Sequence, residues 1–255
     1  MLRFFRKIRL KLFRENKVTH YILYALGEII LIVIGILIAM EIGNWNEQRK
    51  ISQLELVYLQ GLKDEFEQSR VKLQTLIEVN KSVYEDAKKI ADYIATDDFP
   101  DEQQLSVLIF NAFSYEQAYN PNNSLLNEII SAGYLKNITN PKLRQELSTW
   151  ESVIQSIHRQ EATLREQREK VLDIFRKEDG SMRTILEQAD IIDRQMGLIK
   201  SKNQDSNLSL IKSREFENNL LPYILTGMMM ESEHYKPLLD RINKILELID
   251  KKIAE

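Results

Sequence analysis

Residues 21–45 constrain this chain more than any other stretch. Between residues 21 and 40 the single charged residue is Glu28, and the run from Ile29 to Met40 is unbroken by any polar side chain. Because an α-helix rises about 1.5 Å per residue, twenty such residues cover the roughly 30 Å hydrocarbon core of a bilayer. The stretch therefore predicts a transmembrane helix over residues 21–45.

Aromatic residues stand at both ends of this stretch, with Tyr21 and Tyr24 at its start and Trp45 at its end. Such amphipathic rings are typical interfacial anchors. The competing interpretation is a cleaved signal peptide, whose apolar region is only about 7 to 15 residues long and ends at a small-residue cleavage site. Gly43-Asn44-Trp45 is a poor cleavage site. We therefore expect an uncleaved anchor.

The two flanks of the span differ in charge. Basic and acidic residues are mixed after it, whereas seven basic residues and one acid, Glu15, precede it. The basic residues are Arg3, Arg6, Lys7, Arg9, Lys11, Arg14 and Lys17. The positive-inside rule then predicts a cytoplasmic N-terminus and a single-pass inner-membrane protein with everything from Asn46 onward in the periplasm.

Residues 1–20 are the cytoplasmic segment in this scheme. Apolar residues recur there at spacings of three and four, with basic residues between them. This pattern favours an amphipathic helix on the lipid bilayer surface, where each Lys or Arg adds about 1 kcal/mol of attraction to anionic lipid. The alternative is a flexible basic tail that only sets topology. RNA binding is disfavoured because no aromatic platform accompanies the charges.

Several short motifs in the first 60 residues are more specific than composition. They are FFRKIR at 4–9, ENK at 15–17, YALGEIILIVIGILIA at 24–39 and NWNEQRK at 44–50, with a weaker match at 124–147. In these motifs the chain resembles an uncharacterised family of single-span proteins abundant in the Bacteroidota. The resemblance implies an inner-membrane protein of a Gram-negative cell with a periplasmic helical domain. It implies no activity, because that family is known as a domain of unknown function.

Composition limits what the part beyond the span can be. About 210 residues remain there, enough for one large or two small domains. The formal net charge of −3 includes the basic head, so the remainder is more acidic than the total, and we expect no nucleic-acid partner. The absence of cysteine excludes a disulfide framework. Stability must come from packing.

Beyond the span the sequence predicts an all-α fold, an elongated antiparallel helical bundle with coiled-coil-like seams over residues 46–255. Two stretches alternate inward positions at steps of three and four, the spacing of helices that pack along their length. We expect residues 66–94 and 143–175 to pair as a stem. The first seam is Phe66, Ser69, Leu73, Leu76, Asn80, Val83, Ala87, Ile90 and Ile94. The second is Leu143, Leu147, Trp150, Ile154, Ile157, Glu161, Leu164, Arg168, Val171 and Phe175.

A small helical insert is expected at about 101–140. Pro100 ends the preceding helix, Asp98 or Asp101 caps the next, and the turn at 120–123 separates a helix at 101–119 from one that stops near Gly133. We interpret an aromatic cluster as the core of this helix pair rather than as a ligand pocket. Its members are Phe110, Phe113, Tyr115, Tyr119 and Tyr134.

The remaining chain predicts more helices. One starts at Pro141 after the cap Asn140 and runs to about residue 177. Others cover 182–199, 214–233 with Pro222 as a kink or a restart, and 238–253. Residues 200–207 are the most loop-like. If the domain has a subdomain boundary, it is expected there or at 96–101.

Candidate chemistry is sparse. Glu231 and His234 have the Glu-x-x-His spacing of di-iron bundles, and His158 with Glu161 forms a reversed pair. Such a site needs two forward motifs and two further glutamates, so we interpret these residues as a solvated helix face. No phosphate loop and no nucleophile paired with a base occurs. We therefore expect no metal, no cofactor and no enzyme activity.

One face of the span carries small residues and one carboxylate: Ala25, Glu28, Gly35, Ala39 and Gly43. At 100° per residue they fall on a single side, and the last three repeat the small-xxx-small spacing of close helix contacts. We expect this face to contact a second copy or another membrane protein. The alternative is that Glu28 extends toward the cytoplasmic headgroups and the small residues are incidental.

Three function classes follow from these observations. The favoured hypothesis is a membrane-anchored helical scaffold or adaptor that self-associates or binds protein partners in the cell envelope. The alternative is a periplasmic small-molecule sensor that works with a separate signalling subunit. An enzyme is the least favoured class, because the sequence carries no catalytic motif.

Overall fold

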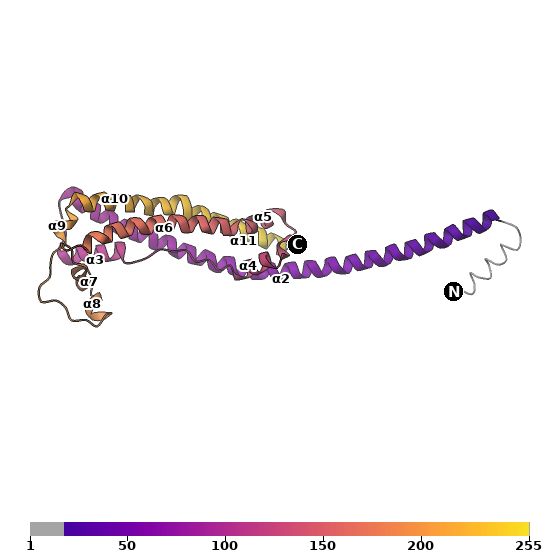
Figure 1. Cartoon of the computed structure of the whole chain (residues 1–255), viewed down its shortest axis with the longest axis horizontal. Coiled ribbons are helices and arrows are strands. Elements are labelled where there is room, and N and C mark those ends of the chain that lie inside the picture. The colour runs from indigo at the N-terminus through magenta and orange to yellow at the C-terminus, as the bar shows by residue number, and fades with distance from the viewer. Residues whose placement is uncertain (1–17, 255) are drawn as a thin grey trace. The chain divides into compact units, whose positions relative to one another are not determined.

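The structure, a computed structural model, describes residues 18–254, and every regular element among them is a helix (Figure 1). The predicted all-α fold is therefore confirmed. The α-helices are α2 (Val18–Thr96), α3 (Glu102–Phe113), α4 (Ser124–Ser131), α5 (Pro141–Ser148), α6 (Trp150–Phe175), α7 (Met182–Gln188), α8 (Ile191–Arg194), α9 (Leu208–Ile211), α10 (Arg214–Met229) and α11 (Lys236–Ile253). A 3₁₀-helix η1 (Tyr134–Asn137) follows α4, and a π-helix η2 (Met230–Tyr235) joins α10 to α11.

The chain divides into two units, Met1–Val57 and Tyr58–Glu255. In the first unit every side chain from Ile29 to Lys50 is exposed. The second unit holds the hydrophobic core and is a helical bundle. It is not divided further at 96–101 or at 200–207, the two subdomain boundaries that the sequence suggested.

Three long helical runs form the bundle: α2 from Tyr58 onward, α6, and the continuous run α10–η2–α11 (Figure 1). The C-terminal run is antiparallel to α2, because Lys63 and Asp250 pair at one end (2.7 Å) and Asp97 and Lys212 pair at the other (2.7 Å). It is antiparallel to α6 as well, and α6 packs along α10 and η2. The helices α2 and α6 consequently run in the same direction.

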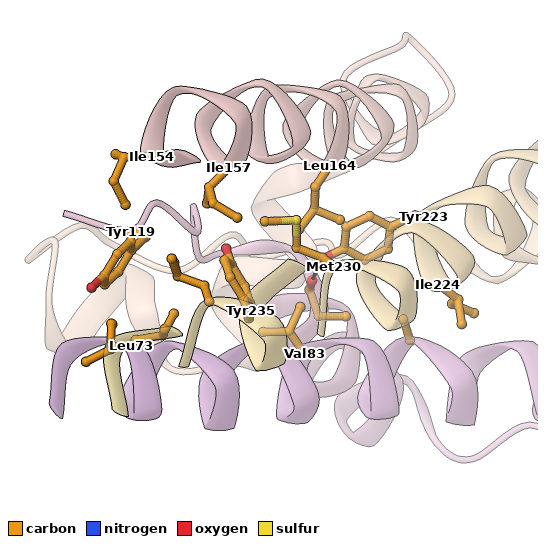
Figure 2. Close-up of a cluster of buried hydrophobic side chains, with 14 of the residues drawn as sticks. Leu73, Val83, Tyr119, Ile154, Ile157, Leu164, Tyr223, Ile224, Met230 and Tyr235 are labelled. Carbon is orange, nitrogen blue, oxygen red and sulfur yellow. Dashed lines mark hydrogen bonds between the residues drawn. The ribbon is translucent and has the colours of Figure 1, made fainter. Parts of the chain in front are cut away.

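The two predicted seams line the core of this bundle. Their apolar members are buried, except for the half-buried Leu76 and Ile94, and the polar members Ser69, Asn80 and Glu161 are buried with them. The seams meet directly where the Phe66 and Trp150 rings pack edge to face with centroids 4.9 Å apart. Elsewhere other buried side chains, here called the middle layer, lie between the two seams. Figure 2 shows Leu73 and Val83 of α2 facing Ile154, Ile157 and Leu164 of α6 across Tyr119, Met230 and Tyr235.

Helix starts follow the local signals in the sequence. Asp101 caps α3 by accepting the Gln104 N–H at 2.8 Å, and Asn140, just before Pro141, caps α5 by accepting the N–H groups of Lys142 and Leu143. These side chains satisfy amide donors that the first helical turn leaves without intrahelical acceptors. Gly133, at φ 71°, ends the segment that begins with α4. All these positions agree with the predictions.

Two predicted helices are interrupted by breaks at single residues. The helix from Pro141 is interrupted at Thr149, whose hydroxyl donates to the Gln145 carbonyl and competes with the helix ladder. The predicted helix at 182–199 divides into α7 and α8 and stops at Arg194, because Asp190 and Gly197 adopt left-handed φ of 58° and 65°. Periodicity alone does not detect such single-residue breaks.

Candidate functional site

The predicted helix at 101–119 ends at Phe113, and residues 114–123 are an extended segment, here called the strap. The strap runs along the bundle from α3 to α4 (Figure 1). Gln117, Tyr119 and Pro121 are buried while the residues between them are exposed, the two-residue alternation of an extended chain. The insert is therefore two short helices joined by this strap.

The aromatic cluster proposed for the insert is not a core of its own. Phe113 packs against Tyr223 of α10 with centroids 5.1 Å apart, and Tyr119 is buried in the middle layer of the bundle. Tyr115 and Tyr134 are exposed. The prediction was wrong because the helix that would have grouped these rings ends six residues before Tyr119.

Side chains of α2 and α6 satisfy the backbone of the strap. Glu161 Oε1 accepts the Tyr119 N–H at 2.7 Å, and His158 Nε2 lies 3.0 Å from the Tyr119 carbonyl oxygen. On the opposite side, Ser69 Oγ accepts the Asn122 N–H at 2.8 Å and donates to the Asn122 carbonyl at 3.2 Å. A buried extended segment without a neighbouring strand needs such partners. This explains why the polar residues Ser69 and Glu161 stand in the two seams.

Two cations extend the same arrangement along the strap. Lys72 Nζ donates to the Asn120 carbonyl at 3.1 Å, and Arg168 Nε donates at 2.7 Å to the carbonyl of Phe113, the residue just before the strap. Each side chain is an inward or flanking member of a long helix, so the two helices hold the strap along its length. We refer to Ser69, Lys72, His158, Glu161 and Arg168 as the strap clamp.

A second polar group surrounds the π-helix. Glu231 is 7% exposed; its Oε2 accepts the Tyr84 hydroxyl at 2.6 Å, and its Oε1 pairs with Lys236 Nζ at 2.7 Å. One turn away, Asn80 Nδ2 donates to the Gly227 carbonyl at 2.9 Å. These contacts place the first half of the Glu-x-x-His motif in the core. The interpretation as a solvated helix face was wrong for both glutamates, Glu231 and Glu161, which are buried.

The two polar groups are joined through Tyr235, the last residue of η2, whose hydroxyl donates to Glu161 Oε1 at 2.9 Å. A π-helix widens the helix by one residue per turn and often occurs at functional positions. Here it turns both Glu231 and Tyr235 into the bundle. Among the side chains that the structure describes, residues 22–254, no group of three or more His, Cys, Asp or Glu could hold a metal ion.

Burial and hydrogen bonding shift the pKa values of these groups. Burial raises the pKa of the Glu161 carboxyl, and the hydrogen bonds from Tyr119 and Tyr235 oppose that shift only in part. Burial also acts on Glu231, but hydrogen bonds from Lys236 and Tyr84 outweigh it and lower the pKa of that carboxyl. Burial, assisted by Glu231, raises the pKa of Tyr84 to about 12. The network therefore contains one carboxyl that holds its proton more tightly and one that releases it more readily.

A surface groove of about 310 Å³ lies between α6 and the η2–α11 junction. Ser152, Ser156 and Ile157 line it from α6, and Glu233, His234, Leu238 and Arg241 line it from the other side. His234, the second member of the Glu-x-x-His motif, thus faces this groove while Glu231 faces the core. The groove is at the lower end of the volumes of small-molecule sites, about 300–1,000 Å³.

The predicted membrane residues lie in the first unit. Gly35, Ala39 and Gly43 are exposed on α2, whereas Ala25, Glu28 and Tyr24 are half-buried and Trp45 is 64% exposed. A Cβ added at Gly35 or Gly43 would meet no atom within 4 Å. Packing within the unit therefore does not require these glycines. The side chain of Tyr21 and all seven basic residues of the N-terminal segment lie outside the described part of the chain.

Sequence reasoning identified the seams but not the strap clamp. Two sequence features pointed to the strap clamp: the polar residues Ser69 and Glu161 within the seams, and the two-residue alternation from Gln117 to Pro121. Neither feature identifies the clamp unless the contacts are known. In the described part of the chain, the carboxylates and hydroxyls of these two polar groups hold backbone atoms and each other.

Comparison with known families identifies the group to which the chain belongs. A family model described as "Family of unknown function (DUF6090)" matches residues 28–193, more than half of the chain. The chain is a member of this family. The DUF6090 match begins within the apolar stretch and ends in α8, so it includes the strap clamp and excludes α10, η2 and α11. No curated protein and no solved structure matches the chain.

Proposed function

We propose that this DUF6090 protein is a membrane-anchored helical scaffold or adaptor of the cell envelope. The supporting observation is the exposure of its apolar stretch. Every large apolar side chain from Ile29 to Met40 is between 46% and 72% exposed, and this is the one stretch among the described residues with the length and composition of a membrane span. Monomeric soluble proteins rarely expose so large an apolar surface, whereas a bilayer would cover it.

The proposed orientation places the N-terminus in the cytoplasm and the helical bundle in the periplasm. The basic flank before the span supports this orientation through the positive-inside rule. Reporters that are active only in the periplasm or only in the cytoplasm, fused after Glu255, test it. We expect periplasmic activity and a membrane pellet that resists alkaline extraction. Cytoplasmic activity at the C-terminus, or release by alkali, would overturn the placement.

Self-association through the span is the second part of the proposal. The face of Ala25, Glu28, Gly35, Ala39 and Gly43 would allow close helix contact, and the openness around Gly35 and Gly43 leaves their small size without a reason inside the monomer. Replacing Gly35 and Ala39 by Ile should weaken association in a transmembrane reporter assay while insertion persists. Replacing Glu28 by Leu should do the same. If Glu28 instead extends to the headgroups, that variant inserts better and associates as strongly as the wild type.

The groove beside η2 favours a second candidate, a periplasmic sensor of a small molecule. A ligand bound in the groove would contact the α10–η2–α11 run. The same run carries Tyr235, whose hydroxyl donates to Glu161 of the strap clamp, so this run links the groove to the bundle core. Thermal-shift screening of the purified protein against a metabolite library tests this candidate. A hit that stabilises the wild type but not a Ser156→Trp variant would support it, and a set of hits unaffected by that variant would argue against the groove.

A further inference from the structure

The outward surface of α10 is unusual for this chain. Charged residues are 29% of the sequence, yet residues 218–230 contain none. The inward side chains of this stretch are buried, but its outward side chains are apolar too: Leu221, Leu225, Met228 and Met229 are 50%, 58%, 43% and 48% exposed. A helix that is apolar all round is normally covered on every side. Half of this one is uncovered in the single chain.

The exposed positions form a regular seam, here called the α10 seam. Asn218, Leu221, Leu225, Met228 and Ser232 are all exposed and follow steps of three, four, three and four. This is the spacing of a helix that packs along a second helix. The outward face of α11 shows the contrast, because Lys236, Asp240, Lys244, Glu247 and Lys251 cover it with charge.

We propose that the α10 seam pairs with the α10 seam of a second copy of this chain. In a two-fold contact a residue on the axis faces its own copy, so a charge there would face a like charge. The seam has no charge to repel itself. Each apolar position then faces the same apolar position of the other copy. Asn218 can donate to and accept from Asn218 of the other copy, and such a polar residue in a seam fixes the register of the two helices.

The size of the seam favours a copy in the same membrane over a freely diffusing partner. Its apolar positions, from Leu221 to Met228, extend about 10 Å along the helix. A strip of that length and about one helix diameter (10–12 Å) in width covers far less area than the roughly 800 Å² per partner of a stable independent interface. Two chains anchored in one bilayer are held at a high effective concentration, so a short contact between them suffices. The inference rests on the proposed anchoring and adds a contact outside the span.

Single cysteines test the pairing in the full-length chain, because it contains no native cysteine. Membranes carrying Leu225→Cys are oxidised with copper phenanthroline and compared with Arg159→Cys, an exposed position on α6. We expect Leu225→Cys to form a disulfide-linked dimer at least ten-fold faster. Adding Leu221→Glu should abolish the cross-link, and circular dichroism should show an unchanged helix content. Equal rates at the two positions would overturn the proposal.

Further arms separate this inference from the proposed function. A Leu225→Cys chain that pellets with membranes but does not cross-link keeps the anchoring and overturns the seam. A chain released by alkali overturns the anchoring itself. A photo-reactive residue at 225 that yields adducts whose mass is not twice that of the chain shows a different partner and also overturns pairing of copies. Cross-linking that persists with Gly35→Ile and Ala39→Ile shows that the seam acts independently of the span face.

Discussion

The strap clamp makes a quantitative prediction at Glu161. Replacing Glu161 by Leu leaves two buried donors, the Tyr119 N–H and the Tyr235 hydroxyl, without their acceptor. Each orphaned donor costs about 1–3 kcal/mol, so the gross loss is about 2–6 kcal/mol. Burial of the Glu161 carboxylate costs free energy in the wild type. The Leu variant avoids this cost, which offsets part of the loss. We expect a net loss of about 2–3 kcal/mol, and each kcal/mol lowers the Tm by about 2–4 °C for a domain of this size.

Glu161→Gln keeps an oxygen acceptor and removes the charge, so its effect depends on pH. The folded-state pKa of Glu161 is raised above its unfolded value, which means that the folded protein binds this proton more tightly. The stability contributed by protonation is complete below the unfolded pKa of about 4.5 and is lost as pH rises through the folded pKa. The Gln variant does not lose it. Its stability relative to the wild type should therefore increase as pH rises from about 4.5 toward 8.

Thermal unfolding of the detergent-solubilised chain, followed by circular dichroism at several pH values, measures both effects. Glu166→Gln is the matched control on the same helix, because Glu166 is exposed and the hydrogen bond from Lys170 lowers its pKa. The stability of Glu166→Gln relative to the wild type should change only slightly with pH, and it should decrease as pH rises. A Glu161→Leu protein with the wild-type midpoint would show that the clamp does not stabilise the fold. A Gln variant whose relative stability falls as pH rises would refute the burial argument.

Three further predictions concern packing. Ile157→Asp places a charge at a position that is 5% exposed and should destabilise the bundle by several kcal/mol, measured as a lower urea midpoint. Trp150→Ala removes the ring that packs on Phe66 and should cost about 3–5 kcal/mol in the same titration, whereas Trp150→Phe should recover most of it. Gly227→Val would place a Cβ 3.2 Å from the Tyr84 Cβ, so α2 and α10 must separate, and faster amide exchange in α10 is the expected readout.

The family match and the helices agree with what the residues predicted, while the membrane placement and assembly remain predictions. The resemblance implied a family of unknown function, and the DUF6090 match confirms that description. Orientation and cellular compartment are proposals that rest on the basic flank. Predicted contacts with lipid and with protein partners await the experiments above.

The sequence by itself determined the features that depend on neighbouring residues. Helix periodicity repeats every three or four positions, so both seams were readable, and a cap such as Asp101 or Asn140 acts on amides two or three residues away. The exposed apolar stretch is equally local, because twenty consecutive side chains define it. These features established the all-α class and the starts of several helices.

Only the tertiary structure decided which helices are partners and where the buried polar groups lie. The antiparallel partner of both α2 and α6 is the C-terminal run, and the strap enters the core between them. The deciding contacts join distant residues: Tyr119 and Glu161 are 42 positions apart, and Tyr84 and Glu231 are 147 apart. A buried glutamate and a solvated one have the same local spacing. Burial depends on what the rest of the chain brings against the helix, which periodicity does not contain.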